Sequence, residues 1–381
     1  MAKKATIKVA SAEEKSAKAA TGNNMKKAVG TAVNKKFDLD NYKKSKNLLS
    51  NSTWKKQEWI PLSPAFNNAI SLPGLPHGGI SLIRGHSDTG KSTALCEAAI
   101  SAQKLGKLPV LIITEMKFKW SHFIKMGFDA QMIPDPETGE VQYTGDFIYV
   151  DRDSLSTIED VAAFIVDILD EQKKGKLPYD LVFLWDSAGS IPCQMSIDSG
   201  KNNNLWNAGA MATQFGNFIN QRFALSKKPS SQYTNSFYVV NKIRVELPPP
   251  GSNPKVQPKL KNKAGDALYW DAEVIIEFGN VTNAGTSKIK ATKNGKDVVF
   301  AKRTKIAVDK NHTADVTTRA TIIMTAHGFI EDTPKAIEQY KKEHRHEWLE
   351  ILGSDDFDIV EEPDVEENIR DVFNNIEADD E

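Results

Sequence analysis

One stretch of the chain has the residue types and the spacing of a phosphate-binding loop. It reads Gly85-His86-Ser87-Asp88-Thr89-Gly90-Lys91-Ser92-Thr93 and fits the pattern G-x-x-x-x-G-K-S/T. Its glycines let the backbone curl so that successive N–H groups point at phosphate oxygens. The pattern assigns Lys91 to the β- and γ-phosphates and the hydroxyl of Ser92 to magnesium. An ordinary glycine turn is the alternative interpretation.

The segments around this stretch favour the phosphate-binding interpretation. An apolar run at residues 80–83 predicts a strand before it, and residues 94–105 predict a helix after it. The first N–H groups of a helix have no partner within the helix, so a loop that leads into a helix presents donors to an anion. We therefore expect the loop to bind a nucleoside triphosphate together with magnesium.

Two acidic residues follow predicted strands and suit the chemistry of nucleotide hydrolysis. The apolar run 181–185 ends in Asp186, and a magnesium-bound phosphate needs a carboxylate beside its loop. Glu115 follows the apolar run 110–114, where a carboxylate can orient and deprotonate an attacking water. For Glu115 the alternative is a surface glutamate in a loop.

A polar residue and two polar segments follow further predicted strands. Lys242 comes just after the apolar run 237–240, where a γ-phosphate sensor would lie. Residues 195–207 and 246–263 are long polar segments of the kind that functional loops form. Cations together with an aromatic residue expected to be exposed, here Trp206, favour a surface that binds single-stranded nucleic acid. The alternative is that these segments form a lid or plain linkers. The cations are Lys201, Arg244, Lys255, Lys259, Lys261 and Lys263.

Composition excludes several classes of protein. Of the 381 residues 40% are hydrophobic and 26% are charged, as in ordinary globular proteins. No apolar run is long enough to span a membrane, and the start of the chain lacks the apolar region of a signal peptide. Cys96 and Cys193 lack zinc-site spacing, which favours a reducing compartment. We predict a cytoplasmic protein with no membrane partner.

The two ends of the chain carry opposite charge. Residues 1–57 contain 14 Lys and four acidic residues, a net charge of +10. Residues 354–381 contain 13 acidic residues and one Arg, a net charge of −12. Both ends are open to interpretation as solvating tails. The sharper hypothesis is a partly disordered basic arm for nucleic acid or a neighbouring subunit, with an acidic tail that competes for the same positive surfaces.

Strand-like and helix-like segments alternate through the middle of the chain. This alternation predicts an α/β fold with a mostly parallel twisted sheet and helices on both faces. A further strand is expected at residues 147–150. The spacing of Ser156-Thr157-Ile158-Glu159 matches a capping box and predicts a helix over residues 159–172.

Turn signals divide the remaining segments. Turn residues at 134–145 predict a short excursion from the sheet. After residue 269 short turns join the strands, and Asn294-Gly295 is a strong hairpin signal. We therefore expect an antiparallel strand extension on one side of the sheet. Its predicted strands are residues 273–278, 288–292, 297–301 and 320–325.

The order of these motifs resembles that of the RecA-type recombinases over residues 59–330, which implies a RecA-like P-loop NTPase core. In that family a strand ending in Glu, a strand ending in Asp-Ser, a polar loop, a strand ending in Asn-x-Ile-Arg and a second polar loop follow the phosphate loop. Val240-Asn241-Lys242-Ile243-Arg244 is similar to the family's sensor strand. Ala264-Gly265-Asp266-Ala267-Leu268 is similar to the end of its second DNA loop. The length, the Lys-rich start and the acidic end look most like the phage UvsX branch, which implies the host cytoplasm.

The resemblance implies a nucleotide site that holds ATP and Mg²⁺. Lys91, Ser92 and Asp186 would hold the triphosphate and the cation, and Glu115 would be the catalytic base. His122 occupies the position at which the family places an aromatic residue on the adenine. These roles belong to the resemblance and not to the spacing alone.

The resemblance also implies sites for DNA and for a neighbouring subunit. Trp206 lies near the position of a base-step wedge, and Arg244 would meet a DNA phosphate, as would the backbone of Ala264-Gly265. Lys310 and His312 would reach across an interface to the neighbour's γ-phosphate. Two departures stand out: the second of these cations is His and not Lys or Arg, and the sensor is Lys242 where relatives have Gln or His.

The function that the resemblance implies is that of a DNA-dependent ATPase, a recombinase that forms filaments on single-stranded DNA. It would promote homologous pairing and strand exchange in recombination and repair. Its partners would be single-stranded DNA, homologous duplex DNA, further copies of the chain, and single-strand-binding and loader proteins. The expected organisation is a basic N-terminal arm (1–57), a RecA-like ATPase core (58–330), and a C-terminal helix with an acidic tail (331–381).

Two other functions stay open. A ring helicase has the same core, but it would ordinarily carry an N-terminal collar domain and a trans-acting arginine. A DNA-binding recombination mediator with weak ATP turnover is the second alternative. Lys242 and His312 favour this mediator, because both depart from the pattern of efficient relatives.

Overall fold

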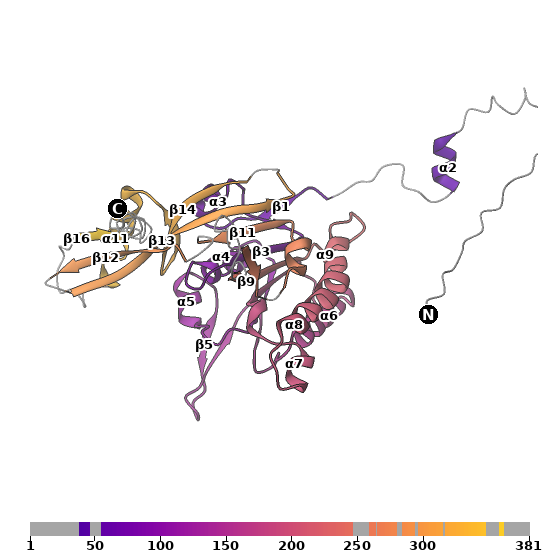
Figure 1. The fold of residues 1–381 in the computed structure, drawn as a ribbon, viewed down its shortest axis with the longest axis horizontal. Helices are drawn as coiled ribbons and strands as arrows, with labels where there is room; N and C mark the ends of the chain where they lie inside the picture. Colours follow the sequence, from indigo (N-terminus) through magenta and orange to yellow (C-terminus); the bar gives the residue numbers. More distant parts are fainter. Residues whose placement is uncertain are drawn as a thin grey trace, which may run out of the picture. The chain divides into compact units, whose positions relative to one another are not determined.

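The computed structural model describes residues 38–45, 55–246, 259–263, 265–279, 284–293, 296–314, 317–347 and 358–361. The chain divides into two compact units, residues 1–53 and 54–381. The element described in the first unit is helix α2 (Leu39–Ser45), whose first turn is capped because the Asp38 carboxylate accepts the N–H of Asn41 at 3.0 Å. The elements described below belong to the second unit (Figure 1).

A mostly parallel sheet forms the centre of the second unit. The bounds of its parallel strands are β3 Gly79–Gly85, β4 Leu108–Ile113, β7 Ile148–Asp151, β8 Leu181–Asp186, β9 Ser236–Glu246 and β11 Val274–Phe278. They lie in the order β11-β3-β9-β8-β4-β7. Every residue of β3 and of β8 is buried, as expected for strands that are covered on both faces. The predicted α/β fold with a mostly parallel sheet is confirmed.

An antiparallel extension continues the sheet beyond β11. Its strands are β12 (Ser287–Lys293), β13 (Lys296–Asn311), β14 (Arg319–Thr325), β15 (Gly328–Glu331) and β16 (Asp358–Glu361). Strand β13 pairs with β11, β12 and β14, and β14 pairs with β15. Because Lys293 lies opposite Lys296, β12 and β13 form the predicted hairpin, whose turn residues Asn294 and Gly295 lie outside the described residues. Within the predicted acidic tail, β16 adds to the edge of β12.

Helices cover both faces of the sheet (Figure 1). Two adjacent residues of β4 belong to different core clusters. Leu111 is in the same cluster as Ala98, and Val110 is in the same cluster as Ile165. Successive side chains of a strand point to opposite faces, so the two clusters lie on opposite sides. The first face is covered by α3 (Pro64–Ile70), α4 (Lys91–Lys104) and α5 (Trp120–Lys125). The second is covered by α6 (Ile158–Lys173), α8 (Asn204–Met211), the π-helical turn Ala212–Ile219 and α9 (Asn220–Ser226).

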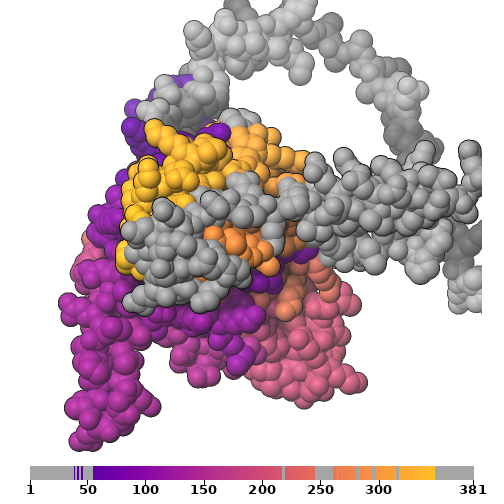
Figure 2. All heavy atoms as spheres, turned by 90° about the vertical axis from the view of Figure 1, so that its left-hand side faces the viewer, coloured from indigo at the N-terminus to yellow at the C-terminus, as the bar shows by residue number. Residues whose placement is uncertain are grey.

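The remaining elements are short. They are β1 (Glu58–Ile60), β2 (Leu75–His77), β5 (Gln131–Pro134), β6 (Val141–Thr144), β10 (Lys259–Asn262), the 3₁₀ turn Ala188–Ser190, α7 (Gln194–Asp198), α10 (Ala267–Asp271) and α11 (Pro334–Glu343). The excursion predicted at residues 134–145 is the β5–β6 hairpin, which protrudes from the body of the unit (Figure 2). Among the described helices, none combines the length and the apolar character needed to cross a membrane.

The capping box that begins α6 lies one residue later than predicted. The N-cap is Thr157 and not Ser156, and its hydroxyl accepts the N–H of Asp160 at 3.0 Å. The Asp160 carboxylate in turn accepts the N–H groups of Thr157 and Ser156 at 2.9 and 3.2 Å. Glu159, the expected partner, instead accepts the N–H of Gln194 at 3.0 Å. The shorter Asp side chain completes the reciprocal pair, so the helix begins at Ile158.

Candidate functional site

The phosphate-binding motif forms the connection between β3 and α4, as predicted. Gly90 is the N-cap of α4, with φ of 108°, and no side chain caps the helix. A Cβ atom at Gly85 would lie 2.3 Å from the Phe278 carbonyl oxygen, so only glycine fits between β3 and β11. The first N–H groups of α4 therefore keep their capacity to bind an anion.

Lys91 is buried at the start of α4. Its ammonium group donates a hydrogen bond to the carbonyl oxygen of His86, within the same loop. Burial lowers the pKa of Lys91 to about 8, although the negative charge of Asp186 acts in the opposite direction. A phosphate group in the loop would offer this cation a stronger partner than a backbone carbonyl.

Ser92 and Asp186 meet beside the loop. The Ser92 hydroxyl donates to Asp186 Oδ2 at 2.5 Å. The other carboxylate oxygen, Oδ1, is buried and has no hydrogen-bond partner among the described residues. Burial raises the pKa of Asp186 to about 6, and the charge of Glu115 adds to that effect. A hydroxyl and a carboxylate are the oxygen ligands that Mg²⁺ prefers, so these residues fit a magnesium-bound phosphate.

Glu115 and Lys242 form an ion pair across the same edge of the sheet. Lys242 Nζ lies 2.8 Å from Glu115 Oε1, and both side chains are about one quarter exposed. Glu115 is held just beyond β4 because its N–H donates to the carbonyl oxygen of Asp186 at 3.1 Å. Lys242 does not end its strand as predicted, since β9 continues to Glu246. It faces the end of β3, where its register partner is Gly85.

These residues surround one cavity of about 350 Å³. The wall contains residues 87–93 of the phosphate loop, together with Glu115, Asp186 and Lys242. His122 of α5 also lines the cavity, and burial followed by the charge of Lys125 lowers its pKa. The structure thus brings most of the predicted nucleotide-site residues together, while Gly85 and His86 of the loop do not line the cavity. Sequence reasoning missed the following lining residues: Lys117, Phe118, Lys119, Phe123, Lys302 and Met324.

Lys310 and His312 lie elsewhere. Neither lines the cavity of its own chain. Lys310 Nζ donates to the carbonyl oxygens of Tyr269 and Trp270, at 3.2 and 2.7 Å, and His312 is exposed. The neighbouring Trp270 side chain is 72% exposed, a surface aromatic that sequence reasoning did not single out.

The first polar segment is helical for much of its length, contrary to the prediction of a polar loop at residues 195–207. Helix α7 ends at Asp198, and α8 begins at Asn204 after Asn203 accepts the N–H of Leu205 at 2.9 Å. Trp206 is not exposed: it is partly buried against the second core cluster. Its neighbour Leu205 is the exposed apolar side chain, at 81%. Of the predicted cations, Lys201 is exposed in the turn between the two helices.

The second polar segment is partly a strand, again contrary to the prediction of a loop over residues 246–263. Strand β10 pairs with residues 243–246 of β9, and residues 247–258, including Lys255, lie outside the described residues. Arg244 and Lys263 are exposed, while Lys261 is half-buried. Lys259 begins β10. The remaining predicted residue, Ala264, is also outside the described residues.

The residues that directly follow the two polar segments lie against each other. A Cβ atom at Gly265 would lie 2.7 Å from Cβ of Ala208, which belongs to α8. The Lys263 N–H donates to the carbonyl oxygen of Lys242 at 2.8 Å, so the second segment also contacts the strand that carries the cavity residue. The strand that carries Lys242, the end of the second segment and helix α8 therefore lie next to one another.

Comparison with known proteins points to RecA. No protein-family model matches the chain. Protein RecA of Chlorobaculum tepidum is 35% identical over 80 residues, which is 20% of this chain and 23% of the relative. Protein RecA of Chloroherpeton thalassium is 30% identical over 107 residues, 27% of this chain and 30% of the relative. Protein RecA of Streptococcus equi subsp. zooepidemicus is 26% identical over 254 residues, 66% of this chain and 56% of the relative.

These alignments cover between about one quarter and somewhat more than half of the RecA relatives. They show that the chain is similar to RecA proteins, in agreement with the resemblance drawn from the motifs.

Proposed function

We propose that the chain is a DNA-dependent ATPase of the RecA type that assembles on single-stranded DNA and promotes homologous pairing and strand exchange. The observation that carries the proposal is the meeting of Lys91, Ser92, Asp186, Glu115 and Lys242 around one cavity at the end of the parallel strands. Parallel α/β sheets bind ligands at this edge. The similarity to RecA proteins supports the same activity.

Each cavity residue has a role in this proposal. Bound ATP and Mg²⁺ supply the phosphoanhydride bond that is cleaved and the charge that offsets the phosphates. Lys91 would leave the His86 carbonyl to contact phosphate oxygens, and the Ser92–Asp186 pair would hold the cation. His122, in the cavity wall, would stack on the base.

Glu115 would accept a proton from the attacking water. In the structure Lys242 donates a hydrogen bond to Oε1 of its carboxylate. The other oxygen, Oε2, would orient the water. Lys242 would sense the γ-phosphate, because an anion in the cavity competes with Glu115 for its ammonium group. Lys242 lies in β9, which continues to Arg244 and pairs with β10. A movement of Lys242 from Glu115 to the phosphate would therefore act on the strand that carries the proposed DNA contacts.

The DNA surface in this proposal consists of exposed side chains in or next to the two polar segments. Lys201, Arg244 and Lys263 are exposed cations of this set, and Lys255, Lys259 and Lys261 would extend it. The backbone of Ala264-Gly265 would approach a DNA phosphate. Because Trp206 packs partly into the core, the exposed Leu205 is the better candidate for contact with bases.

The assembly in the proposal is a filament in which copies of the chain share nucleotide sites. Lys310 and His312 would complete the site of a neighbour, and the exposed Trp270, which Lys310 contacts, supports an edge that another copy covers. Single-strand-binding and loader proteins would be further partners. Within the family we favour the phage UvsX branch and hence the host cytoplasm, on the strength of the charged ends of the chain.

Replacing the proposed base tests the enzymatic part of the proposal. Glu115→Gln should bind ATP and single-stranded DNA as the wild type does but lose hydrolysis by about two to four orders of magnitude. Glu137→Gln, exposed in the β5–β6 turn, is the matched control and should keep full activity. The measurement is the rate of phosphate release with and without single-stranded DNA. Wild-type rates in Glu115→Gln would refute the assignment of the base.

A further inference from the structure

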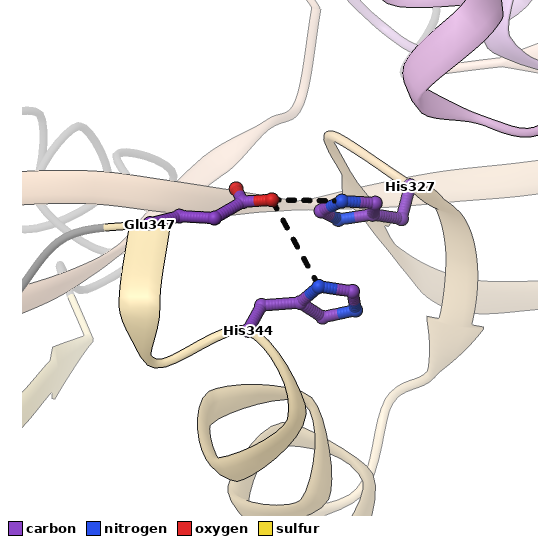
Figure 3. A group of neighbouring side chains, drawn as sticks. All are labelled: His327, His344 and Glu347. Carbon is purple, nitrogen blue, oxygen red and sulfur yellow. Dashed lines mark ion pairs between the residues drawn. The ribbon is translucent and has the colours of Figure 1, made fainter.

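Two histidines and a glutamate gather at the edge of the antiparallel extension, away from the nucleotide cavity. His327 lies in the turn between β14 and β15, and His344 follows α11. Glu347 lies one turn after His344, since its N–H donates to the His344 carbonyl oxygen at 3.0 Å. Figure 3 shows both rings beside the same carboxylate oxygen, Oε1, which lies 2.9 Å from His327 Nε2 and 3.9 Å from His344 Nδ1.

We infer that His327, His344 and Glu347 bind one divalent transition-metal ion of the zinc class. Two imidazoles and a carboxylate are ligands that suit Zn²⁺, Ni²⁺ or Cu²⁺ better than Mg²⁺, which prefers oxygen ligands alone. The site is therefore chemically distinct from the Ser92–Asp186 pair. It does not depend on the function proposed above.

The distances suit such an ion. Bonds of about 2.0–2.2 Å in tetrahedral geometry place neighbouring ligand atoms about 3.3–3.6 Å apart. The separations of 2.9 and 3.9 Å bracket that value, and the three ligand atoms all lie within 4.8 Å of one another. The two rings are stacked, with centroids 3.7 Å apart and planes 15° from parallel. Because a ring nitrogen binds a metal in the plane of its ring, one imidazole must turn out of the stack on binding.

The surroundings support ligation by His327 Nε2. The other ring nitrogen, Nδ1, lies 2.9 Å from the hydroxyl oxygen of the buried Tyr340. With Nε2 on a metal, Nδ1 carries the proton and donates a hydrogen bond to the Tyr340 hydroxyl oxygen, which is how metal-binding histidines are oriented. The three side chains are each about one fifth exposed, so the ion would have a path from solvent and room for a water as its fourth ligand.

The charge around the group leaves the metal position open. Lys125 Nζ contacts Glu347 on the opposite oxygen, Oε2, at 2.5 Å and not on the oxygen that faces the histidines. A second group of potential ligands, Glu58, His77 and Asp180, differs in this respect. There Lys107 Nζ lies 3.0 Å from Asp180, 3.1 Å from His77 Nε2 and 3.5 Å from Glu58. An ammonium group already occupies the centre of that group, so it carries no metal proposal.

A metal here would connect elements that border the nucleotide cavity. Lys125 belongs to α5, which also places His122 in the cavity wall. On the other side, β15 begins just after His327, and the Phe329 N–H donates to Glu97 of α4 at 2.8 Å. The ion would fix the end of α11 against the β14–β15 turn, and β15 in turn contacts α4 through Phe329. Its ligand Glu347 also contacts Lys125 of α5.

Cobalt and zinc titrations of the full-length, chelator-treated protein test the site. Wild type should bind one Co²⁺ with the visible absorption of tetrahedral coordination, and Zn²⁺ should displace the cobalt and raise the melting temperature. His344→Asn and Glu347→Gln should each weaken Co²⁺ binding by at least about 100-fold. This loss exceeds the one expected when a residue that only supports a ligand is changed. Tyr340→Phe should weaken Co²⁺ binding by about 10- to 100-fold, because it removes the hydrogen bond that orients His327 and leaves all three ligands in place.

Two controls locate the site. His346→Asn, an exposed histidine two residues from His344, should bind Co²⁺ as the wild type does. Asp186→Asn should also bind it, because that carboxylate serves the nucleotide cavity. Wild-type Co²⁺ affinity in both His344→Asn and Glu347→Gln would overturn the proposal, and so would equal losses in His344→Asn and His346→Asn. Loss of the tetrahedral signal in Asp186→Asn would assign the metal to the other site and overturn it too.

Discussion

Asp186 is buried, and burial disfavours the ionised form of its carboxyl group. Its ionisation is therefore sensitive to what is bound in the nucleotide site. Its neighbour Ser92 donates one hydrogen bond, while Oδ1 has none from the described residues. An ionised carboxylate in this position is buried without a compensating positive charge as long as no cation is bound. A buried charge of this kind lowers the stability of the metal-free protein.

Replacing Asp186 should therefore stabilise the nucleotide-free protein in a pH-dependent way. Burial raises the pKa of Asp186 from 3.8 to about 6, so the folded state retains its proton between these values and the unfolded state loses it. The contribution of Asp186 to the stability of the wild type falls as the pH rises through this window, and Asp186→Asn lacks this contribution. The variant should gain up to about 3 kcal/mol above about pH 6. Urea unfolding in the presence of a chelator, from about pH 4.5 to 8, measures the difference.

Asp167→Asn, exposed on α6, is the matched control and should show no such gain. A stability difference between Asp186→Asn and wild type that stays constant with pH, or that shrinks as the pH rises, would contradict the buried charge. The same variant should lose magnesium-dependent nucleotide binding, because its amide is a poorer ligand for a hard cation than a carboxylate is.

Glu97 joins three elements around the phosphate loop. It lies in α4, and its carboxylate accepts the N–H of Ser63 at 2.9 Å and that of Phe329 at 2.8 Å. Ser63 is the N-cap of α3, and Phe329 belongs to β15. Burial raises the pKa of Glu97. Because Phe329 also packs against Gly90, this carboxylate sets the position of the loop from the side of the antiparallel extension.

Glu97→Gln should destabilise the fold by about 1–3 kcal/mol. The amide has only one acceptor oxygen, so one of the two backbone N–H groups would face an NH₂ group. Glu338→Gln, exposed on α11, is the control and should leave the stability unchanged. Urea unfolding gives the free energies, and ATP titration should also detect weaker binding through the displaced Phe329. Equal stability of Glu97→Gln and wild type would mean that α4 and β15 are not held together by this residue.

The elements that carry the nucleotide site could be predicted because they have local signatures. The phosphate loop has a fixed spacing, and Asp186 and Glu115 each follow a continuous apolar run. The lining residues Lys302 and Met324 could not be found in this way, since they reach the cavity only through the pairing of β13 and β14. Neither strand has a sequence signal for nucleotides.

The polar segments were harder to predict for a different reason. Polar composition at residues 195–207 favours a loop, yet Asn203 caps α8 and the buried Asn207 accepts the N–H of Cys193 at 2.9 Å. These local hydrogen bonds organise the segment into two short helices and turn Trp206 toward the core. Side-chain capping of this kind depends on positions in space that polar composition does not specify.

The opposite charges of the chain ends and the position of Lys310 suit a molecule that works as an assembly. Residues 1–57 carry a net charge of +10 and residues 354–381 one of −12, so neighbouring copies would attract each other and compete with DNA. Lys310 and His312 lie outside their own cavity. In the proposed filament they complete the neighbour's site, whereas in a lone molecule they have no role in catalysis.

Electron microscopy of the full-length protein with single-stranded DNA, Mg²⁺ and a non-hydrolysable ATP analogue tests the central proposal most directly. Extended helical filaments that require both DNA and nucleotide are the predicted result, because the nucleotide would sit between successive copies. Closed rings under the same conditions would favour the helicase alternative, and DNA coated in the absence of nucleotide would favour the mediator. Either result would contradict a RecA-type filament ATPase.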